Sequence, residues 1–339
     1  MKYVKQITLG YQADGKPYRK RIYANSKAEL DRNIHKALSE YELIKNPSNI
    51  TFKKYAERWM ETYKASREAA TIEMYQNALR KTDSIDYMRM KDIRLSDLQK
   101  ILANNFDHPN ACAKIRLTFA QIWACALQDG IISDDFTKRL ETPKMKVTEG
   151  RALTDEEKSA IKAAELTDEE RIYIYLLFYL GLRPQEALAL TPEDFNGDTV
   201  TIQRAVGYQG NKPYIKTTKT MNIRVMPIPD DFQPFLDYYL SQLKQPYLLG
   251  RNNNIMSKTV KSDLWLSIKK KIEDKLGYET DLHPYVFRHN YCTMCFYSGI
   301  SLKKCQYLMG HSSVQMIMKI YTHLDDSKEP LDKLKSMKF

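Results

Sequence analysis

The pattern of hydrophobic and polar positions changes its period along the chain, and these changes divide it into three predicted segments. In the first segment, residues 3–10 and 17–23 read as strands that flank Asp14-Gly15, a dipeptide typical of tight turns. A capping-box pattern then predicts a helix. We therefore predict a small β-rich domain over residues 1–46.

The second segment, residues 50–142, has apolar side chains at helical spacing. Behind Thr51 an apolar stripe consists of Phe52, Tyr55, Ala56, Trp59, Met60 and Tyr63. Further helices are predicted after Thr71, after Ser96 and before Gly130. The aromatic stripe is typical of a hydrophobic core, and a base-stacking surface is the alternative interpretation. This segment is therefore predicted to be a helical domain.

The third segment, residues 150–339, mixes helices with one small predicted sheet. Capping boxes open helices at Thr154 and Thr167, and the second of these helices stops at Gly181. Three stretches read as strands: 199–205, 214–218 and 222–226. The residues after them read as helical. The predicted fold class of the whole chain is mixed α+β and mostly α.

Charge points to a polyanionic partner. The chain has 53 Lys and Arg residues against 42 Asp and Glu residues, for a net charge of +11. Nucleic acid is the first expectation, an anionic membrane surface the second, and a basic protein with neither partner is the remaining alternative. The first predicted hairpin carries Arg19, Lys20 and Arg21 on one strand, where they could enter a DNA groove. A charged, solvated hairpin is the alternative.

Two further patterns bear on compartment and metal binding. The longest apolar run, residues 172–180, is too short to span a bilayer, and the opening residues lack the apolar core of a signal peptide. A cytoplasmic protein without membrane contact, and with five reduced cysteines, is therefore expected. Cys292-x-x-Cys295 allows a zinc site, but a buried pair one helical turn apart is favoured because no second pair completes the site.

Four short motifs follow one another in the third segment: Gly181–Leu190, Lys219–Pro227, Tyr285–His289 and Leu308–Ser313, with Tyr321 ten residues after His311. In these motifs the chain resembles the tyrosine recombinases, a family that includes lambda-type integrases, conjugative-transposon integrases and Xer proteins. The helical segment is similar to the family's core-binding domain, and residues 1–46 resemble its arm-type DNA-binding domain. The resemblance implies that residues 150–339 are an α/β catalytic domain of the DNA breaking-rejoining type.

The resemblance implies that Tyr321 is the nucleophile, and the chemistry of strand exchange is consistent with this. A covalent 3′-phosphotyrosine keeps the energy of the phosphodiester bond, so that the strand can be rejoined. Negative charge builds on the phosphate oxygens during attack, and guanidiniums bind such oxygens with paired hydrogen bonds. Arg183 and Arg288 match the family's two catalytic arginines.

The family pattern also assigns the remaining site residues. Lys219 is expected to protonate the departing 5′-oxygen from the turn of a hairpin, with Lys216 as the competing lysine. His311 is expected to donate a hydrogen bond to the phosphate. Glu186 lies one helical turn after Arg183 and is expected to orient it.

One position departs from the usual family pattern. Tyr285 stands three residues before Arg288, where the family most often has histidine. A phenol can donate a hydrogen bond to phosphate, but it is a poor base near pH 7. His289 lies on the same helical face in our prediction and could partly substitute as the base.

The expected partners follow from the resemblance. They are double-stranded DNA attachment sites, bound by a homotetramer, with an excisionase and a DNA-bending protein as candidate accessory proteins. Lys144 and Lys146 lie in the linker between the second and third segments, residues 142–150, and are expected to follow the DNA backbone. Residues 331–339 are expected to dock on a neighbouring subunit. The scheme uses no metal and no cofactor. The alternatives are a cellular Xer-like resolvase, or a DNA-binding regulator that has lost strand transfer.

Overall fold

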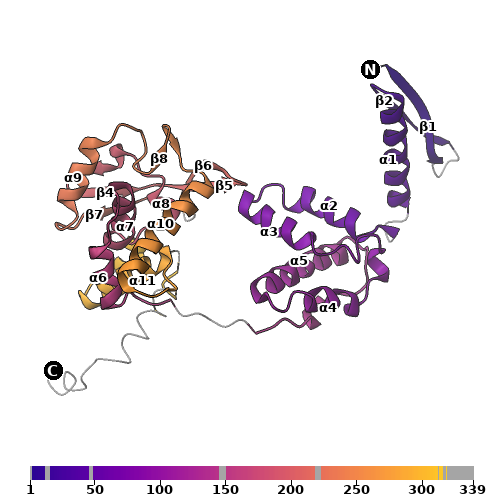
Figure 1. Ribbon diagram of the computed structural model, residues 1–339. Helices are drawn as coiled ribbons and strands as arrows, with labels where there is room; N and C mark the ends of the chain where they lie inside the picture. Colours follow the sequence, from indigo (N-terminus) through magenta and orange to yellow (C-terminus); the bar gives the residue numbers. More distant parts are fainter. Residues whose placement is uncertain are drawn as a thin grey trace, which may run out of the picture. The chain divides into compact units, whose positions relative to one another are not determined.

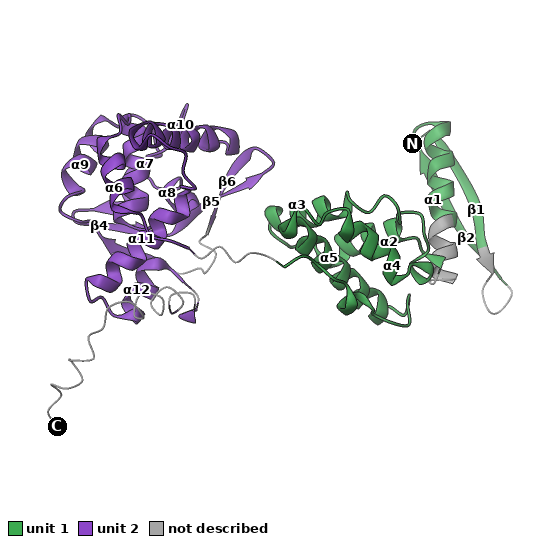
Figure 2. Cartoon of the chain, turned by 60° about the horizontal axis from the view of Figure 1, so that its bottom comes forward, with its two compact units in different colours: residues 1–146 green, residues 147–339 purple. Residues whose placement is uncertain are grey.

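A computed structural model of the chain describes residues 2–11, 16–45, 49–144, 150–217, 223–311, 313–315 and 318. The chain divides into two compact units, Met1–Lys146 and Val147–Phe339 (Figures 1 and 2). Both consist mainly of helices with small sheets, which confirms the predicted fold class. Among the helices described, none combines the length and the apolar character needed to cross a bilayer.

The first unit begins with a hairpin of β1 (Tyr3–Tyr11) and β2 (Pro17–Ala24), which pair antiparallel. Helix α1 (Lys27–Lys45) packs against this hairpin (Figure 1). The hydroxyl of Ser26 accepts a hydrogen bond from the backbone N–H of Glu29 at 3.2 Å and so caps α1. Four buried side chains form the small core between the hairpin and the helix: Ile22, Ala24, Leu30 and Ala37. The hairpin and its helix therefore form as the sequence predicts.

The helical part of the first unit consists of α2 (Phe52–Tyr63), α3 (Ala69–Leu79), α4 (Leu95–Ala103) and α5 (Pro109–Gln128), with short 3₁₀ turns at Met90–Asp92 and Thr137–Arg139. Phe52, Tyr55, Ala56 and Trp59 are buried, which confirms the core interpretation for most of the aromatic stripe, whereas Tyr63 at its end is 41% exposed. Two predicted boundaries are wrong. Helix α4 starts at Leu95, before Ser96. Helix α3 starts before Thr71, because the carbonyl of Glu68 already accepts hydrogen bonds from the first helical turn.

The second unit contains α6 (Asp155–Ala163), α7 (Asp168–Tyr179), α8 (Pro184–Ala187), α9 (Gln233–Gln242), α10 (Lys258–Leu276), α11 (Pro284–Tyr297) and α12 (Leu302–Met309). Both predicted capping boxes are present. Thr154 accepts a hydrogen bond from Glu157 N at 3.1 Å, and Thr167 accepts one from Glu170 N at 3.3 Å. The apolar helix α7 contributes several side chains to the core of this unit, and it ends next to Gly181.

The second unit has three small described sheets instead of the single predicted one. The first has the order β3 (Phe195–Asn196), β4 (Thr199–Ile202), β7 (Arg224–Pro227), the second pairs β5 (Arg204–Gln209) with β6 (Lys212–Thr217), and the third pairs β8 (Gly250–Arg251) with β9 (Asn254–Ile255). The predicted strand 199–205 breaks at Gln203. The Gln203 side chain donates to Asp194 in the 3₁₀ turn Pro192–Asp194 at 2.9 Å, and the chain passes there from one sheet to the next.

The prediction that everything after the third strand is helical is also wrong. Strands β8 and β9 are joined by Asn252 and Asn253, whose φ angles are 51° and 62°. Two consecutive residues with positive φ form the turn that matches the twist of a hairpin, and asparagine tolerates this conformation better than most residues. The Asn-Asn pair was therefore an available signal.

Candidate active site

The first motif places Arg183 at a sharp change of chain direction. Gly181 has a φ of +57°, and a Cβ there would lie 2.5 Å from the Tyr291 ring, so only glycine suits this position. Arg183 is the N-cap residue of α8, and its guanidinium donates to Glu186 at 2.8 Å. Glu186 also accepts the backbone N–H of Arg183 at 2.9 Å. The Arg183 side chain is 27% exposed and is thus accessible to a ligand.

The third motif buries Arg288 on α11. Its guanidinium donates to the carbonyl of Gly181 at 2.7 Å and to the carbonyl of Met309. Burial and the neighbouring Arg183 guanidinium lower the pKa of Arg288 to about 9. The side chain therefore stays charged at neutral pH.

Three arginines meet at the C-terminal end of α12. The carbonyl of Leu308 accepts from Arg224 at 2.8 Å, that of Met309 accepts from Arg288, and that of Gly310 accepts from Arg183 at 2.8 Å. The last carbonyls of a helix have no partner within the helix and carry the negative end of its dipole. The helix end therefore collects three positive charges.

Arg224 is the residue of this group that sequence reasoning missed. It opens β7 with a side chain that is only 2% exposed, and it contacts both carboxylate oxygens of Glu186, at 2.7 Å and 3.2 Å. Burial alone would raise the pKa of Glu186, but the hydrogen bond and charge of Arg224, with the charges of Arg288 and Arg183, lower it to about 2. An arginine at the inward position of a strand was the available signal, because such a charge needs a buried partner.

His311 follows this helix end directly. Its backbone N–H donates to the carbonyl of Gln306 at 3.1 Å, and its buried Nδ1 has no hydrogen-bond partner among the described residues. Burial, together with the positive charges of Arg288 and Arg183, lowers the pKa of His311 to about 4. The imidazole is therefore neutral at pH 7 in the absence of DNA.

The first turns of α11 hold the other predicted site residues. Tyr285 is 44% exposed, one turn before the buried Arg288. His289 is half-buried, and burial, with the charges of Arg288 and His283, lowers its pKa. A Cβ on Gly150 would lie 2.1 Å from His289 Nε2, so the backbone at the end of the linker covers the imidazole.

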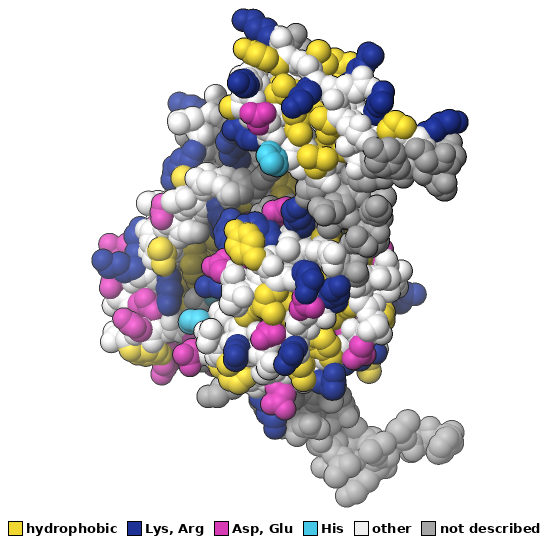
Figure 3. All heavy atoms as spheres, turned by 90° about the vertical axis from the view of Figure 1, so that its right-hand side faces the viewer, with side chains coloured by type: hydrophobic (Ala, Val, Ile, Leu, Met, Phe, Trp, Pro, Cys, Tyr) yellow, Lys and Arg dark blue, Asp and Glu magenta, His cyan; other side chains and the backbone are white. Residues whose placement is uncertain are grey.

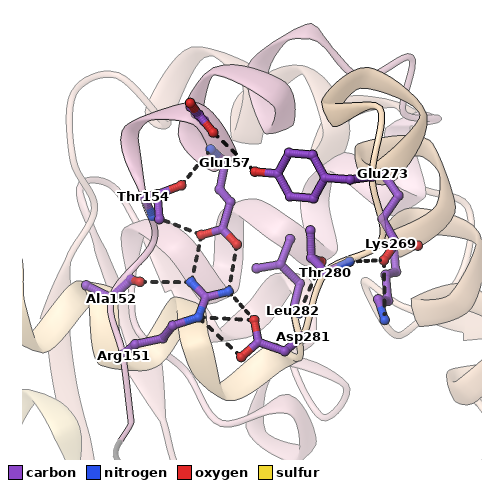
Figure 4. A network of polar contacts seen from close by, with 11 residues as sticks. Arg151, Ala152, Thr154, Glu157, Lys269, Glu273, Thr280, Asp281 and Leu282 are labelled. Carbon is purple, nitrogen blue, oxygen red and sulfur yellow. Dashed lines mark hydrogen bonds and ion pairs between the residues drawn. The ribbon is translucent and has the colours of Figure 1, made fainter.

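A polar network fixes the chain next to that glycine (Figure 4). Arg151 donates to both carboxylate oxygens of Glu157, at 2.8 Å and 2.7 Å, and its Nε donates to Asp281 at 3.1 Å. Asp281 lies three residues before the first residue of α11. This network therefore connects the start of the second unit to the helix that carries Arg288.

Several predicted site residues lie outside the described residues. These are Tyr321, Lys219, Lys146 and residues 331–339. The connection that contains Lys219 joins β6 to β7, but β6 pairs with β5 and β7 pairs with β4. Lys219 thus lies between two strands in the sequence, and its place at a turn there stays a prediction. Lys216 lies on β6, and Lys144 is exposed.

The predicted DNA-binding residues of the hairpin do not share one face. Arg19 pairs with Thr8 and Arg21 with Gln6, so both lie on the outer face, whereas Lys20 pairs with Ile7 on the face toward α1. All three are exposed. Lys and Arg side chains are more frequent than Asp and Glu side chains around the hairpin, at the top of the view in Figure 3.

The buried cysteines of α11 and α12 form a separate apolar cluster. Cys292 and Cys295 on α11 are buried, as the buried-pair interpretation predicts, and Cys292 Sγ lies 3.7 Å from Cys305 Sγ on α12. Within the described part of the chain, no group of three or more His, Cys, Asp or Glu residues is arranged to hold a metal ion.

Two sequence families match the chain. Residues 151–328 match the phage integrase family, and residues 51–105 match the N-terminal SAM-like domain of phage integrases. A relative named tyrosine recombinase XerC-like, from Caldanaerobacter subterraneus subsp. tengcongensis, is 26% identical and aligns over 94% of this chain and 91% of its own length. The tyrosine recombinase XerC of Agrobacterium fabrum is 24% identical, over 80% of this chain and 89% of its own.

Solved structures share the fold. The Tn1549 transposon integrase in complex with a circular intermediate DNA matches with a TM-score of 0.70 and 17% identity, covering 85% of this chain and 98% of that one. A lambda integrase tetramer bound to a Holliday junction matches with a TM-score of 0.65 and 15% identity, covering 89% of this chain and 92% of that one. At this identity the likeness concerns the fold alone.

Proposed function

The chain belongs to the phage integrase family and is a tyrosine recombinase, a DNA strand-transfer enzyme, and from this premise we propose that it is the integrase of a mobile genetic element. The observation that carries its strand-transfer chemistry is the convergence of Arg183, Arg224 and Arg288 on the end of α12, directly before His311. The likeness in fold to the Tn1549 transposon integrase and to lambda integrase supports the mobile element. Such a concentration of guanidiniums suits the negative charge of a phosphodiester under attack.

In the proposed reaction, the phenol oxygen of Tyr321 attacks a backbone phosphorus while the bond to the 5′-oxygen breaks. The products are a 3′-phosphotyrosine and a free 5′-hydroxyl. The phenol loses a proton, and the departing oxygen gains one from Lys219. The 5′-hydroxyl of a second strand then attacks the phosphotyrosine and releases Tyr321, so that no nucleotide is consumed.

Arg183 and Arg288 stabilise the phosphate oxygens in this scheme. The partial exposure of Arg183 supports its role, because the guanidinium can be reached from solvent. Neutral His311 donates a hydrogen bond to the phosphate through the ring nitrogen that carries its proton. Tyr285 donates from an exposed first turn. The Gly150 backbone covers the His289 imidazole, which speaks against His289 as the base for the phenol proton. The positive charges come from arginine, so the scheme needs no metal or cofactor.

The proposed partner is double-stranded DNA with attachment sites, bound by a tetramer of this chain. Arg19 and Arg21 on the outer face of the hairpin, and Lys144 and Lys146 in the linker, supply basic contacts to DNA, whereas Lys20 lies on the opposite face. An excisionase and a DNA-bending protein are the proposed accessory proteins. The enzyme then acts on DNA in a bacterial cytoplasm.

A cellular Xer-like resolvase is the second candidate function. The XerC-like relative aligns over 94% of this chain, so the length of the chain before the core-binding segment does not by itself separate the two roles. A regulator that binds DNA without strand transfer is the third candidate, and Tyr285 in the usual histidine position is the feature that favours it.

The full chain on nicked duplex DNA from the ends of the element tests the proposal. An integrase forms an adduct with DNA that resists SDS, forms equally in EDTA, and is absent in Tyr321→Phe. Tight binding without an adduct supports the regulator. Mapping the DNA that flanks the gene separates the integrase from the Xer-like resolvase. The gene of an integrase should lie at one end of a mobile element, whereas the gene of a cellular resolvase should have no element end beside it.

A further inference from the structure

Arg224 connects two parts of the active site that lie far apart in the sequence. Its Nη1 and Nη2 donate to Glu186 on α8, at 3.2 Å and 2.7 Å, and its Nε donates to the carbonyl of Leu308 on α12, at 2.8 Å. A second contact joins β7 to α12, because the backbone N–H of Val225 donates to the Tyr307 hydroxyl at 2.9 Å. One guanidinium therefore holds β7, α8 and α12 together.

The three arginines differ in what they bind. Among the described residues, Arg288 donates to backbone carbonyls, and Arg183 is partly exposed. The Arg224 guanidinium is fully buried and uses both terminal nitrogens on a carboxylate. Its geometry thus suits a structural contact inside the protein better than a contact to DNA.

What Arg224 holds in place is the support of the other two arginines. Glu186 accepts from Arg183, and the end of α12 accepts from both Arg183 and Arg288. Three positive charges and one negative charge leave a net charge of +2 on the four side chains. A phosphodiester attacked by a phenolate reaches about two negative charges, so this net charge is matched to the transition state.

We propose that Arg224 is a positioning residue for strand transfer, which fixes Glu186 and the end of α12 so that Arg183 and Arg288 face the scissile phosphate together. This inference rests on the proposed function. It extends that function by assigning a role to a third arginine that does not touch the DNA.

The test compares Arg224→Lys with Arg204→Lys. Arg204 is a matched control in the same unit, since its guanidinium also donates to a buried carboxylate, that of Asp194, at 2.5 Å. Its described hydrogen bonds go to Asp194 and Thr191, and not to α12. Lysine keeps the charge at either position and loses the planar fork that binds two partners. Adduct formation on a nicked duplex, DNA affinity and thermal unfolding are measured for each full-length variant.

We expect Arg224→Lys to slow adduct formation at least about tenfold, with DNA affinity within about twofold of wild type. Arg204→Lys should leave both unchanged. Combining Arg224→Lys with Glu186→Gln should slow the reaction little more than the slower single variant, because both changes act through Arg183. Unchanged adduct formation, or DNA affinity that falls in step with the rate, overturns the inference.

A second readout needs no DNA. Burial first, and then the positive charges of Arg288 and Arg183, lower the pKa of His311, so NMR titration of its imidazole responds when the end of α12 or the two guanidiniums move. In Arg224→Lys the pKa of His311 should rise from about 4 toward its ordinary value, whereas Arg204→Lys should not change it. If the His311 pKa rises in Arg224→Lys but the wild-type protein forms no adduct with DNA, the proposed function is contradicted and the positioning role of Arg224 is kept. An unchanged His311 pKa in Arg224→Lys contradicts the positioning role.

Discussion

The guanidinium of Arg183 donates a 2.8 Å hydrogen bond to the carbonyl of Gly310, which lies 127 residues later in the chain. This contact joins the first motif to the fourth. It requires the chain to leave α12 in the left-handed conformation, because Gly310 has a φ of +59°. The glycine that ends α12 therefore also determines where an arginine of the active site lies.

Gly310→Ala should consequently damage the site more than the same change at a helix end elsewhere. A left-handed alanine costs roughly 1–2 kcal/mol, and a Cβ on Gly310 would also lie 2.9 Å from Arg224 Nη1. We expect a lower unfolding midpoint and a loss of adduct formation of about 100-fold, as for removal of one donor to the transition state. Calorimetry and the nicked-duplex assay measure the two effects.

Gly277→Ala is the matched control for this change. Gly277 ends α10 with a φ of +79°, and a Cβ there would meet no described atom within 4 Å. It should lose roughly the same backbone energy, with adduct formation close to wild type. Equal activity of the two variants would show that the close approach at Gly310 does not matter for catalysis.

Arg288→Lys should lose cleavage while keeping most of its DNA binding. An ammonium group cannot reproduce the planar contacts of Arg288 to the carbonyls of Gly181 and Met309 and also face a phosphate. We expect adduct formation to fall about 100-fold. Arg251→Lys is the control, because Arg251 pairs with Glu169 on the surface of the same unit. Normal cleavage by Arg288→Lys would rule out a clamp made of two arginines.

Local signals in the sequence predicted much of this architecture. The capping boxes at Thr154 and Thr167, and the strands around Asp14-Gly15, depend on contacts between residues close in sequence, and the fold contains them. The buried aromatic stripe around Trp59 follows from helical spacing alone. Such features need no knowledge of the rest of the chain.

Features that depend on distant contacts were not predicted. The break at Gln203 depends on Asp194, and the burial of Arg224 depends on Glu186 and on a carbonyl of α12. The alternation of one strand cannot reveal which partners will surround it in the folded unit. The motifs did predict that Arg183, Arg288 and His311 belong together, although not which groups would hold them.

The lowered pKa of His311 predicts how the free energy of unfolding depends on pH. Burial first, and then the charges of Arg288 and Arg183, lower its pKa to about 4 in the folded protein, below the value of about 6.5 in an unfolded chain. As the pH falls, the unfolded chain therefore takes up a proton first, and the free energy of unfolding decreases from about pH 6.5 down to about pH 4. Above this window the titration of this histidine no longer changes the stability.

Urea unfolding at pH 5 and pH 7.5 measures this contribution. His311→Gln should be less sensitive to the change of pH than wild type. Part of the sensitivity should remain, because burial also lowers the pKa of His289. A variant as sensitive as wild type would mean that His311 titrates normally in the folded protein.

The register of the hairpin predicts that neighbouring basic residues contribute differently to DNA binding. Arg19 and Arg21 lie on the outer face of β2, whereas Lys20 lies on the opposite face with Ile7 and Ile22. If the outer face contacts DNA phosphates, Arg19→Gln with Arg21→Gln should weaken DNA binding by the full chain. The slope of log affinity against log salt should then fall by about two, since each phosphate contact contributes about 0.9.

Lys20→Gln is the matched control on the same strand. Its position toward α1 predicts a change in salt slope well below one, because it would not neutralise a phosphate on the outer face. Fluorescence anisotropy of labelled duplex DNA at several salt concentrations measures both slopes. A larger effect of Lys20→Gln than of the double change would place the DNA on the other face of the hairpin, where Lys5 and Tyr3 accompany Lys20.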